Sequence, residues 1–248
     1  MGGPSDGTEA VGGPLEGKRV VVTRAAEEAG ELEALLRERN AVPVRFPCLA
    51  FEDGPDLAQI VRSVGAGPDL IVVSSPQAAR RLLQLIGPTS VPFAAVGQAT
   101  AALLPGEVIV PRSGAGAEAL LAELAPRVRG KRILLPRAGR GTAALLDGLR
   151  AAGAVVEALT LYRTVIPPAA DLAALEGADA LSFASGSAVR GFVALAGAAA
   201  AGKCAVACIG ASTAEEALAA GIRVDAQGGE GLLQLCAALA LAVSARKG

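Results

Sequence analysis

The sequence contains one long internal repeat. Three segments of the first half return in the second half in the same order: GKRVVVTRA (17–25) as GKRILLPRA (130–138), DLIVVSSPQAARRLLQL (69–85) as DALSFASGSAVRGFVAL (179–195), and AVGQATAALL (95–104) as CIGASTAEEA (208–217). Solenoid proteins repeat units of only ~20–50 residues, which is far shorter than the spacing of these segments. The pattern therefore predicts a domain duplication that gives two related lobes, and a cleft between the lobes is the first place to look for function.

The overall composition agrees with two lobes and restricts the partners. A chain of 248 residues is long enough for two domains with a core each. The net charge of −1 and the pI of about 5.7 argue against nucleic acid or an anionic membrane as a partner. Residues 1–16 lack the basic and apolar regions of a secretory signal, so we expect a flexible leader and a cytoplasmic protein. The most apolar stretch, 232–243, is too short to span a bilayer and predicts a closing helix packed on a core.

Missing residue types exclude several kinds of chemistry. The chain contains no histidine, which excludes Ser-His and Cys-His relays and removes the commonest metal ligand. No P-loop is present, and the glycine pairs at 114/116 and 139/141 do not complete a G-x-G-x-x-G motif, so nucleotide binding has little support. The cysteines form no C-x-x-C pair and are interpreted as small buried hydrophobic residues, with a metal or redox site as the alternative: Cys48, Cys204, Cys208 and Cys236.

Short apolar runs alternate with amphipathic helices in both halves. The helix predicted at 28–39 has an apolar stripe that includes Leu32 and Leu36, and Asn40 and Gly153 follow equivalent helices, where left-handed caps are expected. This alternation predicts an α/β fold with an open, doubly wound (flavodoxin-like) parallel sheet in each lobe. The apolar runs that predict its buried strands are 20–22, 42–46, 71–73, 94–96, 108–110, 133–135, 155–161, 180–183, 205–209 and 222–224.

Polar residues follow many of these predicted strands. In doubly wound sheets the ligand binds beyond the carboxyl ends of the strands, so these positions are the candidate ligand-binding residues. Each hydroxyl has the alternative role of capping a helix. Several helix N-termini facing one cleft would suit a ligand with many carboxylates or phosphates. The candidates are Thr23, Arg24, Ser74, Ser75, Gln98, Thr100, Arg137, Arg140, Ser185, Ser187, Ser212 and Thr213.

Two arginines and one tyrosine extend this candidate set. Arg24 and Arg137 are equivalent in the repeat and could each hold a carboxylate with two hydrogen bonds, with an exposed salt bridge as the alternative. Arg80 and Arg190 are also equivalent, but they lie inside their helices and are expected to serve the surface. Tyr162 is the single tyrosine of the chain, and its phenol is either a proton donor or a buried hydrogen-bonding group.

The sequence resembles the uroporphyrinogen-III synthase family over nearly the whole chain after residue 16. The resemblance implies two α/β lobes joined by a two-stranded linker, with the second lobe inserted into the first. It implies a first lobe of 17–46 and 168–248, a second lobe of 52–160, and linker strands at 47–51 and 161–167. It rests on blocks in a fixed order: VVVTR, VVSSPQAA, AVGQATAALL, ILLPRAGR, LTLYRTV, SFASGSA, IGASTAEEAL and GGEGLL.

The same resemblance implies an exchange of strands between the two halves of the sequence. Each lobe would take its first strands from one half and its remaining strands from the other. The run 20–22 is therefore expected to pair with 180–183 and not with 71–73.

The resemblance also implies a reaction and roles for residues. The family cyclises linear hydroxymethylbilane, an octacarboxylate, with loss of water and inversion of the last pyrrole ring, and uses no metal or organic cofactor. Tyr162 matches a tyrosine that assists departure of the hydroxyl group, and Arg137 lies in a basic region common in bacterial relatives. A monomer is expected, with transient contact to the preceding pathway enzyme as a further possibility. Residues near the family's cleft are matched by Ser75, Thr100, Ser185, Gly186, Ser187 and Thr213.

Two other functions fit a two-lobed chain. A solute-binding or sensory module would also close two similar lobes on a ligand, but an exported binding protein should carry a signal segment. A non-catalytic regulatory module for a polyanionic small molecule is the second alternative. Such regulators often carry a DNA-binding extension, for which the segments before 17 and after 243 are too short.

Overall fold

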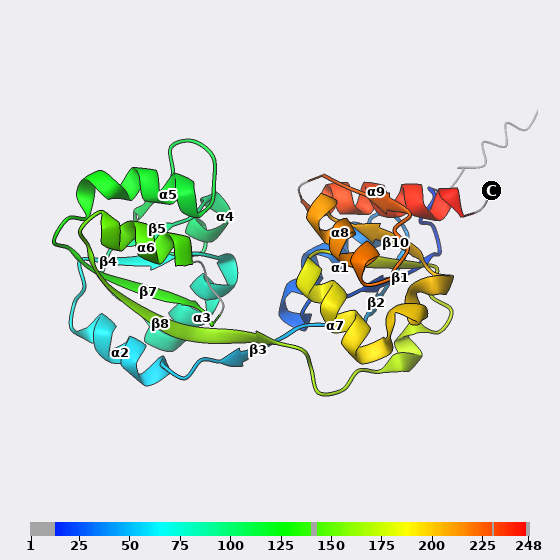
Figure 1. The fold of residues 1–248 in the computed structure, drawn as a ribbon, viewed down its shortest axis with the longest axis horizontal. Helices are drawn as coiled ribbons and strands as arrows, with labels where there is room; N and C mark the ends of the chain where they lie inside the picture. Colours follow the sequence, from blue (N-terminus) through cyan, green and yellow to red (C-terminus); the bar gives the residue numbers. More distant parts are fainter. Residues whose placement is uncertain (1–12, 140–142, 230, 247–248) are drawn as a thin grey trace, which may run out of the picture. The chain divides into compact units, whose positions relative to one another are not determined.

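The chain folds into two compact units. The computed structural model describes residues 13–139, 143–229 and 231–246. The first unit combines the residues up to Ala50 with those from Val165 onward, and the second unit is the continuous stretch Phe51–Thr164 (Figure 1). Each unit is built on one sheet with helices on both faces, which confirms the predicted doubly wound α/β architecture.

The first unit has a parallel sheet with the strand order β11-β10-β9-β1-β2 in the described residues. Helices α1 and α9 pack on one face, and α7 and α8 pack on the other. The strands are β1 (Arg19–Val22), β2 (Val42–Arg45), β9 (Ala180–Phe183), β10 (Ala205–Cys208) and β11 (Ala226–Gln227). The helices are α1 (Ala29–Arg37), α7 (Gly186–Ala196), α8 (Ala211–Ala219) and α9 (Leu232–Ala245), with 3-10 turns at Ala26–Glu28, Leu172–Leu175 and Ala198–Lys203.

The second unit has the strand order β3-β8-β7-β4-β5-β6 in the described residues, and the pairs from β8 to β6 are parallel. Helices α2 and α3 cover one face of the sheet, and α5 and α6 cover the other (Figure 1). The strands are β3 (Ala50–Asp53), β4 (Leu70–Val73), β5 (Phe93–Ala95), β6 (Val108–Ile109), β7 (Arg132–Ala138) and β8 (Val155–Val165). The helices are α2 (Leu57–Gly65), α3 (Pro76–Ile86), α4 (Gln98–Ala101), α5 (Ala117–Leu124) and α6 (Ala143–Ala151), with a 3-10 turn at Ala125–Arg127.

The pairing of the strands confirms the predicted exchange between the two halves of the sequence. In the first unit β1 lies between β2 and β9, and Val20 is opposite Ala180. In the second unit β4 lies between β5 and β7, and Ile71 is opposite Leu134. Each sheet therefore contains strands from both halves of the repeat.

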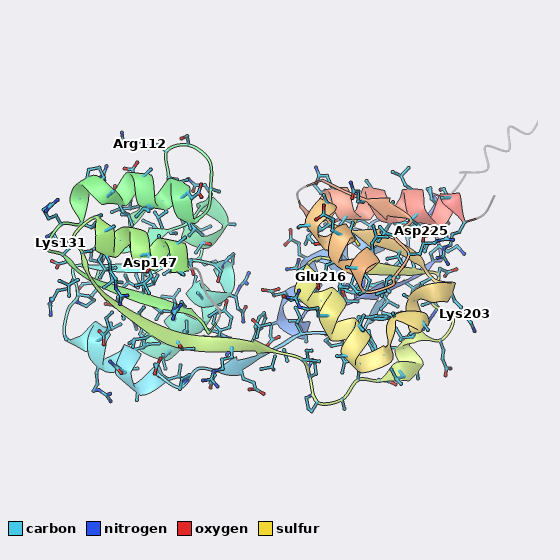
Figure 2. All side chains as sticks on the ribbon, viewed as in Figure 1. Arg112, Lys131, Asp147, Lys203, Glu216 and Asp225 are labelled. Atoms are coloured by element: carbon cyan, nitrogen blue, oxygen red, sulfur yellow. The ribbon has the colours of Figure 1, made fainter. Side chains whose placement is uncertain are left out.

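Two equivalent aspartates fix this exchange at the amino ends of the strands. Asp179 accepts a hydrogen bond from the backbone N–H of Arg19 at 2.8 Å and pairs with the Lys18 ammonium at 2.7 Å. Asp69 repeats the arrangement, with Arg132 N–H at 2.7 Å and the ammonium of Lys131, which is labelled in Figure 2, at 3.5 Å. In both units a carboxylate from one half thus holds a strand that comes from the other half.

Alternation along each central strand supplies apolar side chains to two cores. Val20 and Val22 of β1 contribute to the core under α1 and α9, together with Leu32 and Leu36. Val21, between them, contributes to the opposite core under α7 and α8. Side chains of a strand alternate between the two faces of the sheet, and fully burying one Val or Leu contributes ~1.5–3 kcal/mol. Both faces of each sheet therefore need a helical layer.

The closing helix predicted at 232–243 is observed as α9. Its buried side chains include Leu235, Leu239 and Val243, which pack on the core of the first unit. In the part of the chain that the structure describes, no helix is both long enough and apolar enough to cross a membrane.

The left-handed caps are also confirmed, whereas one predicted strand is wrong. Asn40 has a φ of 57° and Gly153 a φ of 88°, and each ends its helix in the left-handed region. The apolar run 222–224 is a connecting segment, and the edge strand forms later, at β11. Pairing starts there because the Asp225 carboxylate accepts the N–H of Val206 at 2.8 Å and so anchors the chain beside β10.

Glycines allow close backbone packing beside the two chain crossings, the places near residues 50–51 and 164–165 where the chain passes from one unit to the other. A Cβ atom at Gly54 would lie 1.9 Å from the carbonyl oxygen of Thr160, and one at Gly191 would lie 2.1 Å from the carbonyl oxygen of Cys48. Contacts this short with backbone atoms require the local structure to move. The backbone at Thr160 and at Cys48 therefore packs against positions, Gly54 and Gly191, where only glycine fits.

Candidate functional site

The carboxyl end of β4 leads directly into a capped helix. Ser75 adopts an extended conformation after β4, and its Oγ accepts a hydrogen bond from the backbone N–H of Ala78 at 3.0 Å. Pro76 follows at the first helical position, where its fixed φ suits a helix and its missing N–H costs nothing. Ser75 therefore has the capping role that was the alternative interpretation, and Ser74 lies half-buried before it.

The same sheet end holds Tyr162. This residue lies near the carboxyl end of β8, opposite Ala138 of β7, at an irregularity in the β7–β8 register. Its carbonyl oxygen accepts the N–H of Gly139 at 2.8 Å, which fixes its backbone. The side chain is 6% exposed, and its hydroxyl oxygen lies 3.3 Å from Ser75 Oγ, where either group can donate. Two candidate residues that are distant in sequence thus form a pair of hydroxyls at the end of the β8-β7-β4 strands.

Two further side chains surround the tyrosine ring. Phe51 of β3 contacts Tyr162 edge to face, with the ring centroids 5.5 Å apart. The guanidinium of Arg81, on α3, lies 5.7 Å from the Phe51 centroid and 5.8 Å from the Tyr162 centroid. Sequence reasoning missed both residues. The available signal was a break in the repeat, because Arg80 has an arginine counterpart whereas the counterpart of Arg81 is Gly191.

The remaining candidates of the second unit are spread over the carboxyl ends of two other strands. Gln98 begins α4 and is exposed, and Thr100 is buried in the same short helix. Arg137 was expected after a strand that ends at 135, but β7 continues to 138 and includes it as a half-buried residue. The longer strand follows from the pairing of β7 with β8, which is longer still. Arg140 lies outside the described residues.

In the first unit, two candidates are already engaged in structural contacts. The buried hydroxyl of Thr23 donates to the carbonyl of Ser182 at 2.7 Å and so connects β1 to β9. Arg24 donates to the carbonyl of Glu28 at 3.1 Å and pairs with its carboxylate at 3.3 Å. Arg24 therefore makes the salt bridge that was its alternative role.

The helix start after β9 repeats the one after β4. Ser185 caps α7 and accepts the N–H of Ala188 at 3.2 Å. The Arg190 guanidinium donates to Ser187 Oγ at 3.0 Å and pairs at 3.0 Å with Glu216, an acidic residue of α8 labelled in Figure 2. Gly186, between the two serines, packs close to Glu216, since a Cβ there would lie 3.3 Å from Glu216 Cγ. After β10, Ser212 is exposed and Thr213 is buried at the start of α8.

Comparison with known proteins decides the family. A model of the family "uroporphyrinogen-III synthase HemD" matches residues 30–229. The chain belongs to this family. No curated protein matches the chain significantly.

Solved structures of uroporphyrinogen-III synthases share the fold of this family member. One is the enzyme from Helicobacter pylori, at 17% sequence identity and a TM-score of 0.60, with 93% of this chain and 100% of that chain covered. Another is a mutant enzyme from the extremely thermophilic bacterium Thermus thermophilus, at 20% identity and a TM-score of 0.54, with 92% and 99% covered. The match extends over both units of the chain.

The cysteine thiols of this uroporphyrinogen-III synthase family member lie in surroundings that disfavour reaction. All four cysteines are free and buried. Burial raises the pKa of Cys48 and of Cys208 to about 12, which disfavours the nucleophilic thiolate. Within the described ranges, no cluster of acidic or cysteine side chains has the arrangement of a metal site.

A hollow in the second unit lies at the other end of the strands from Ser75 and Tyr162. It has a volume of about 370 Å³ and is lined by residues that include Arg62, Arg132, Val155 and Glu157. Arg132 and Val155 begin β7 and β8, so the hollow lies at the amino ends of these strands. Ser75 and Tyr162 lie at the carboxyl ends, where doubly wound sheets bind their ligands.

Proposed function

We propose that this uroporphyrinogen-III synthase family member cyclises hydroxymethylbilane to uroporphyrinogen III, with loss of water and inversion of the last ring. The observation that carries the proposal is the hydroxyl pair of Tyr162 and Ser75 at the carboxyl end of the second sheet, 3.3 Å apart. A buried phenol with a second hydroxyl beside it is suited to deliver a proton to a leaving oxygen. This assigns the chain to the cyclising hydro-lyases.

In the proposed first step, the phenol O–H of Tyr162 protonates the hydroxyl of the substrate's hydroxymethyl group. The C–O bond breaks and its electron pair leaves with water, while the adjacent pyrrole nitrogen lone pair forms the C=N bond of an azafulvenium ion. The substituted carbon of the last ring attacks this ion to give a spirocyclic intermediate, which rearranges to the macrocycle with that ring inverted. The proton lost on ring closure balances the one that Tyr162 gave.

The protein's second task in this proposal is to hold the linear substrate folded, because closure without the enzyme gives the uninverted ring. Eight carboxylates need many donors, and in the second unit the start of α3 supplies backbone N–H groups at the carboxyl end of β4. Arg137, half-buried near the end of β7, is the proposed partner of one carboxylate. A cytoplasmic monomer that takes its substrate from the preceding pathway enzyme, without a metal or organic cofactor, completes the proposal.

The purified chain tests this function with hydroxymethylbilane as substrate. We expect uroporphyrinogen III in excess over the uninverted isomer that forms in a blank without protein. A product mixture identical to the blank at every protein concentration would overturn the enzyme proposal. Saturable binding of the substrate without inverted product would then identify the non-catalytic binding module.

Replacing the phenol tests the role of the tyrosine. In Tyr162→Phe we expect turnover to fall by roughly a hundredfold, because the proton donor is lost while the ring is kept. The far-ultraviolet circular dichroism spectrum and the urea midpoint serve as controls and should stay close to wild type, since the ring packing is unchanged. Wild-type turnover in this variant would remove Tyr162 from the chemistry.

A further inference from the structure

Arg81 connects three elements of the second unit around the tyrosine. From α3 its guanidinium pairs with the Asp53 carboxylate at 3.0 Å and donates to the carbonyl of Phe51 at 3.2 Å, so two of its contacts are on β3. Its guanidinium carbon also lies within 6 Å of the centroids of Phe51 and of Tyr162, which belongs to β8. The Arg81 side chain is 19% exposed, whereas that of Asp53 is 74% exposed, so the ion pair is open to water although most of the arginine side chain is buried.

These contacts restrict the orientation of the tyrosine ring. A cation near the ring and an aromatic edge at 90° to it each favour particular geometries. The hydroxyl at the end of the same ring lies 3.3 Å from Ser75 Oγ. A tilt of the ring, or a change of χ1 that swings it, would therefore move the hydroxyl away from Ser75, and displacement of a reacting group by ~1 Å can cost up to ~100-fold in rate.

The repeat shows that this arrangement is particular to the second unit. The position on α7 equivalent to Arg81 is Gly191, which packs directly against the backbone of Cys48. The adjacent position, by contrast, is an arginine in both halves, Arg80 and Arg190. In the first unit, α7 thus packs against the segment around Cys48 without an arginine at this position. In the second unit, which contains Tyr162, the equivalent position is the arginine Arg81.

We propose that Arg81 is a positioning residue that holds the Tyr162 phenol at Ser75, in the direction required for proton delivery. The inference rests on the catalytic role proposed for Tyr162. It assigns to Arg81 no contact with the substrate, because Arg81 acts through Tyr162 and Phe51.

The composition of the chain allows a direct test. Tyr162 is the single tyrosine and the chain contains no tryptophan, so the tyrosine bands of the near-ultraviolet circular dichroism and fluorescence spectra report on this one side chain. The variants are Arg81→Met, which keeps the length but removes the charge, and Arg81→Lys, which keeps the charge without the planar fork. Arg80→Met is the matched control, since Arg80 is the exposed neighbour on the same helix.

In Arg81→Met, without substrate, we expect the tyrosine circular dichroism band to weaken because the ring samples more orientations. With hydroxymethylbilane we expect kcat to fall by roughly tenfold or more at a KM within about twofold of wild type. Arg81→Lys should restore part of both signals, and Arg80→Met should match wild type in both.

The spectrum separates failure of this inference from failure of the proposed function. A wild-type tyrosine band in Arg81→Met would overturn the positioning role, whatever the activity. A fall in kcat with that band unchanged would likewise contradict it and would place Arg81 in direct contact with substrate. If the band weakens as expected but Tyr162→Phe keeps wild-type turnover, the catalytic role of the tyrosine fails and the link from Arg81 to the rate fails with it.

Discussion

Ser75 and Ser185 have the same backbone conformation and the same capping contact, but Ser75 additionally lies next to the Tyr162 hydroxyl. Both residues are extended, with φ of −165° and −167°, and both accept an N–H from three residues ahead. The serine at this position of the repeat thus caps a helix in both units, and only in the second unit does it also lie beside a phenol hydroxyl. This difference makes Ser185 a matched reference for Ser75.

We predict that Ser75→Ala and Ser185→Ala each lower the free energy of unfolding by ~1 kcal/mol, through loss of the same N-cap. Ser75→Ala should also change the tyrosine fluorescence, because it removes the hydroxyl beside Tyr162. Urea unfolding and emission spectra of both variants check this. Equal emission in Ser75→Ala and wild type would contradict the hydroxyl contact.

Single residues of the site could be predicted because hydroxyls and arginines at strand ends are visible in sequence. Capping by Ser75 and Ser185 was also expected as an alternative role. The structural role of Thr23 could not be predicted, because its hydrogen bond to the Ser182 carbonyl depends on the pairing of β1 with β9. The position of Arg81 beside Tyr162 was equally hidden, because it depends on how α3 packs over β3 and β8.

At the level of helices and strands, the equivalent aspartates are the contacts that hold strands from opposite halves together. Burial acts to raise the pKa of Asp179, but the hydrogen bonds from Lys18 and from the backbone of Arg19 outweigh it, and the resulting pKa is below its ordinary value. The folded state therefore favours the Asp179 carboxylate. This stabilisation is present above the ordinary aspartate pKa of about 4 and is lost as the pH falls through the lower, folded value.

We predict that Asp179→Asn is less stable than wild type at neutral pH, by at most ~1 kcal/mol because the side chain is about one-third exposed. The difference should shrink in acid, where wild type loses the same charge. Urea midpoints across this pH range test the prediction, with Asp147→Asn on the exposed side of α6 as control. A pH-independent difference between Asp179→Asn and wild type would show that the charge is not responsible.

Secondary structure was largely predictable because the apolar residues recur with clear strand and helix periods and because typical capping residues mark the helix ends. The caps at Asn40 and Gly153 follow from residue types that tolerate a left-handed backbone. The segment 222–224 was mispredicted because an apolar run also suits a loop that faces the core, as the burial of Ile222 shows. The full length of β7 was missed because Pro136 and Arg137 interrupt its apolar run, whereas pairing with β8 carries the strand past them.

At the scale of the whole molecule, the fluorescence of Tyr162 reports on the second unit alone, because the chain has no other tyrosine and no tryptophan. Tyr162 belongs to the second unit, whereas Gly191 belongs to the first, and each unit has its own pair of cores. A change confined to the first unit can therefore be separated from unfolding of the second.

We predict that Gly191→Ala destabilises the first unit by ~1–3 kcal/mol, because its Cβ would meet the Cys48 backbone at 2.1 Å. Urea unfolding followed by far-ultraviolet circular dichroism should begin earlier than in wild type, while the midpoint from tyrosine fluorescence stays unchanged. In Gly30→Ala on α1, where a Cβ has nothing within 4 Å, stability should be equal or slightly higher. Equal shifts of both signals in Gly191→Ala would mean that the two units unfold as one.

The exchange of strands restricts how a chain of this kind can have arisen. Neither half of the sequence contains a complete sheet, because β1 and β2 pair with β9 while β7 and β8 pair with β4. A gene encoding one half alone would give a polypeptide whose first strands need a second copy for their partners. Such a polypeptide would complete its sheets as a swapped homodimer, in which each copy lends its opening strands to the other. Fusion of two such genes would join the two subunits covalently, and folding would then no longer depend on protein concentration.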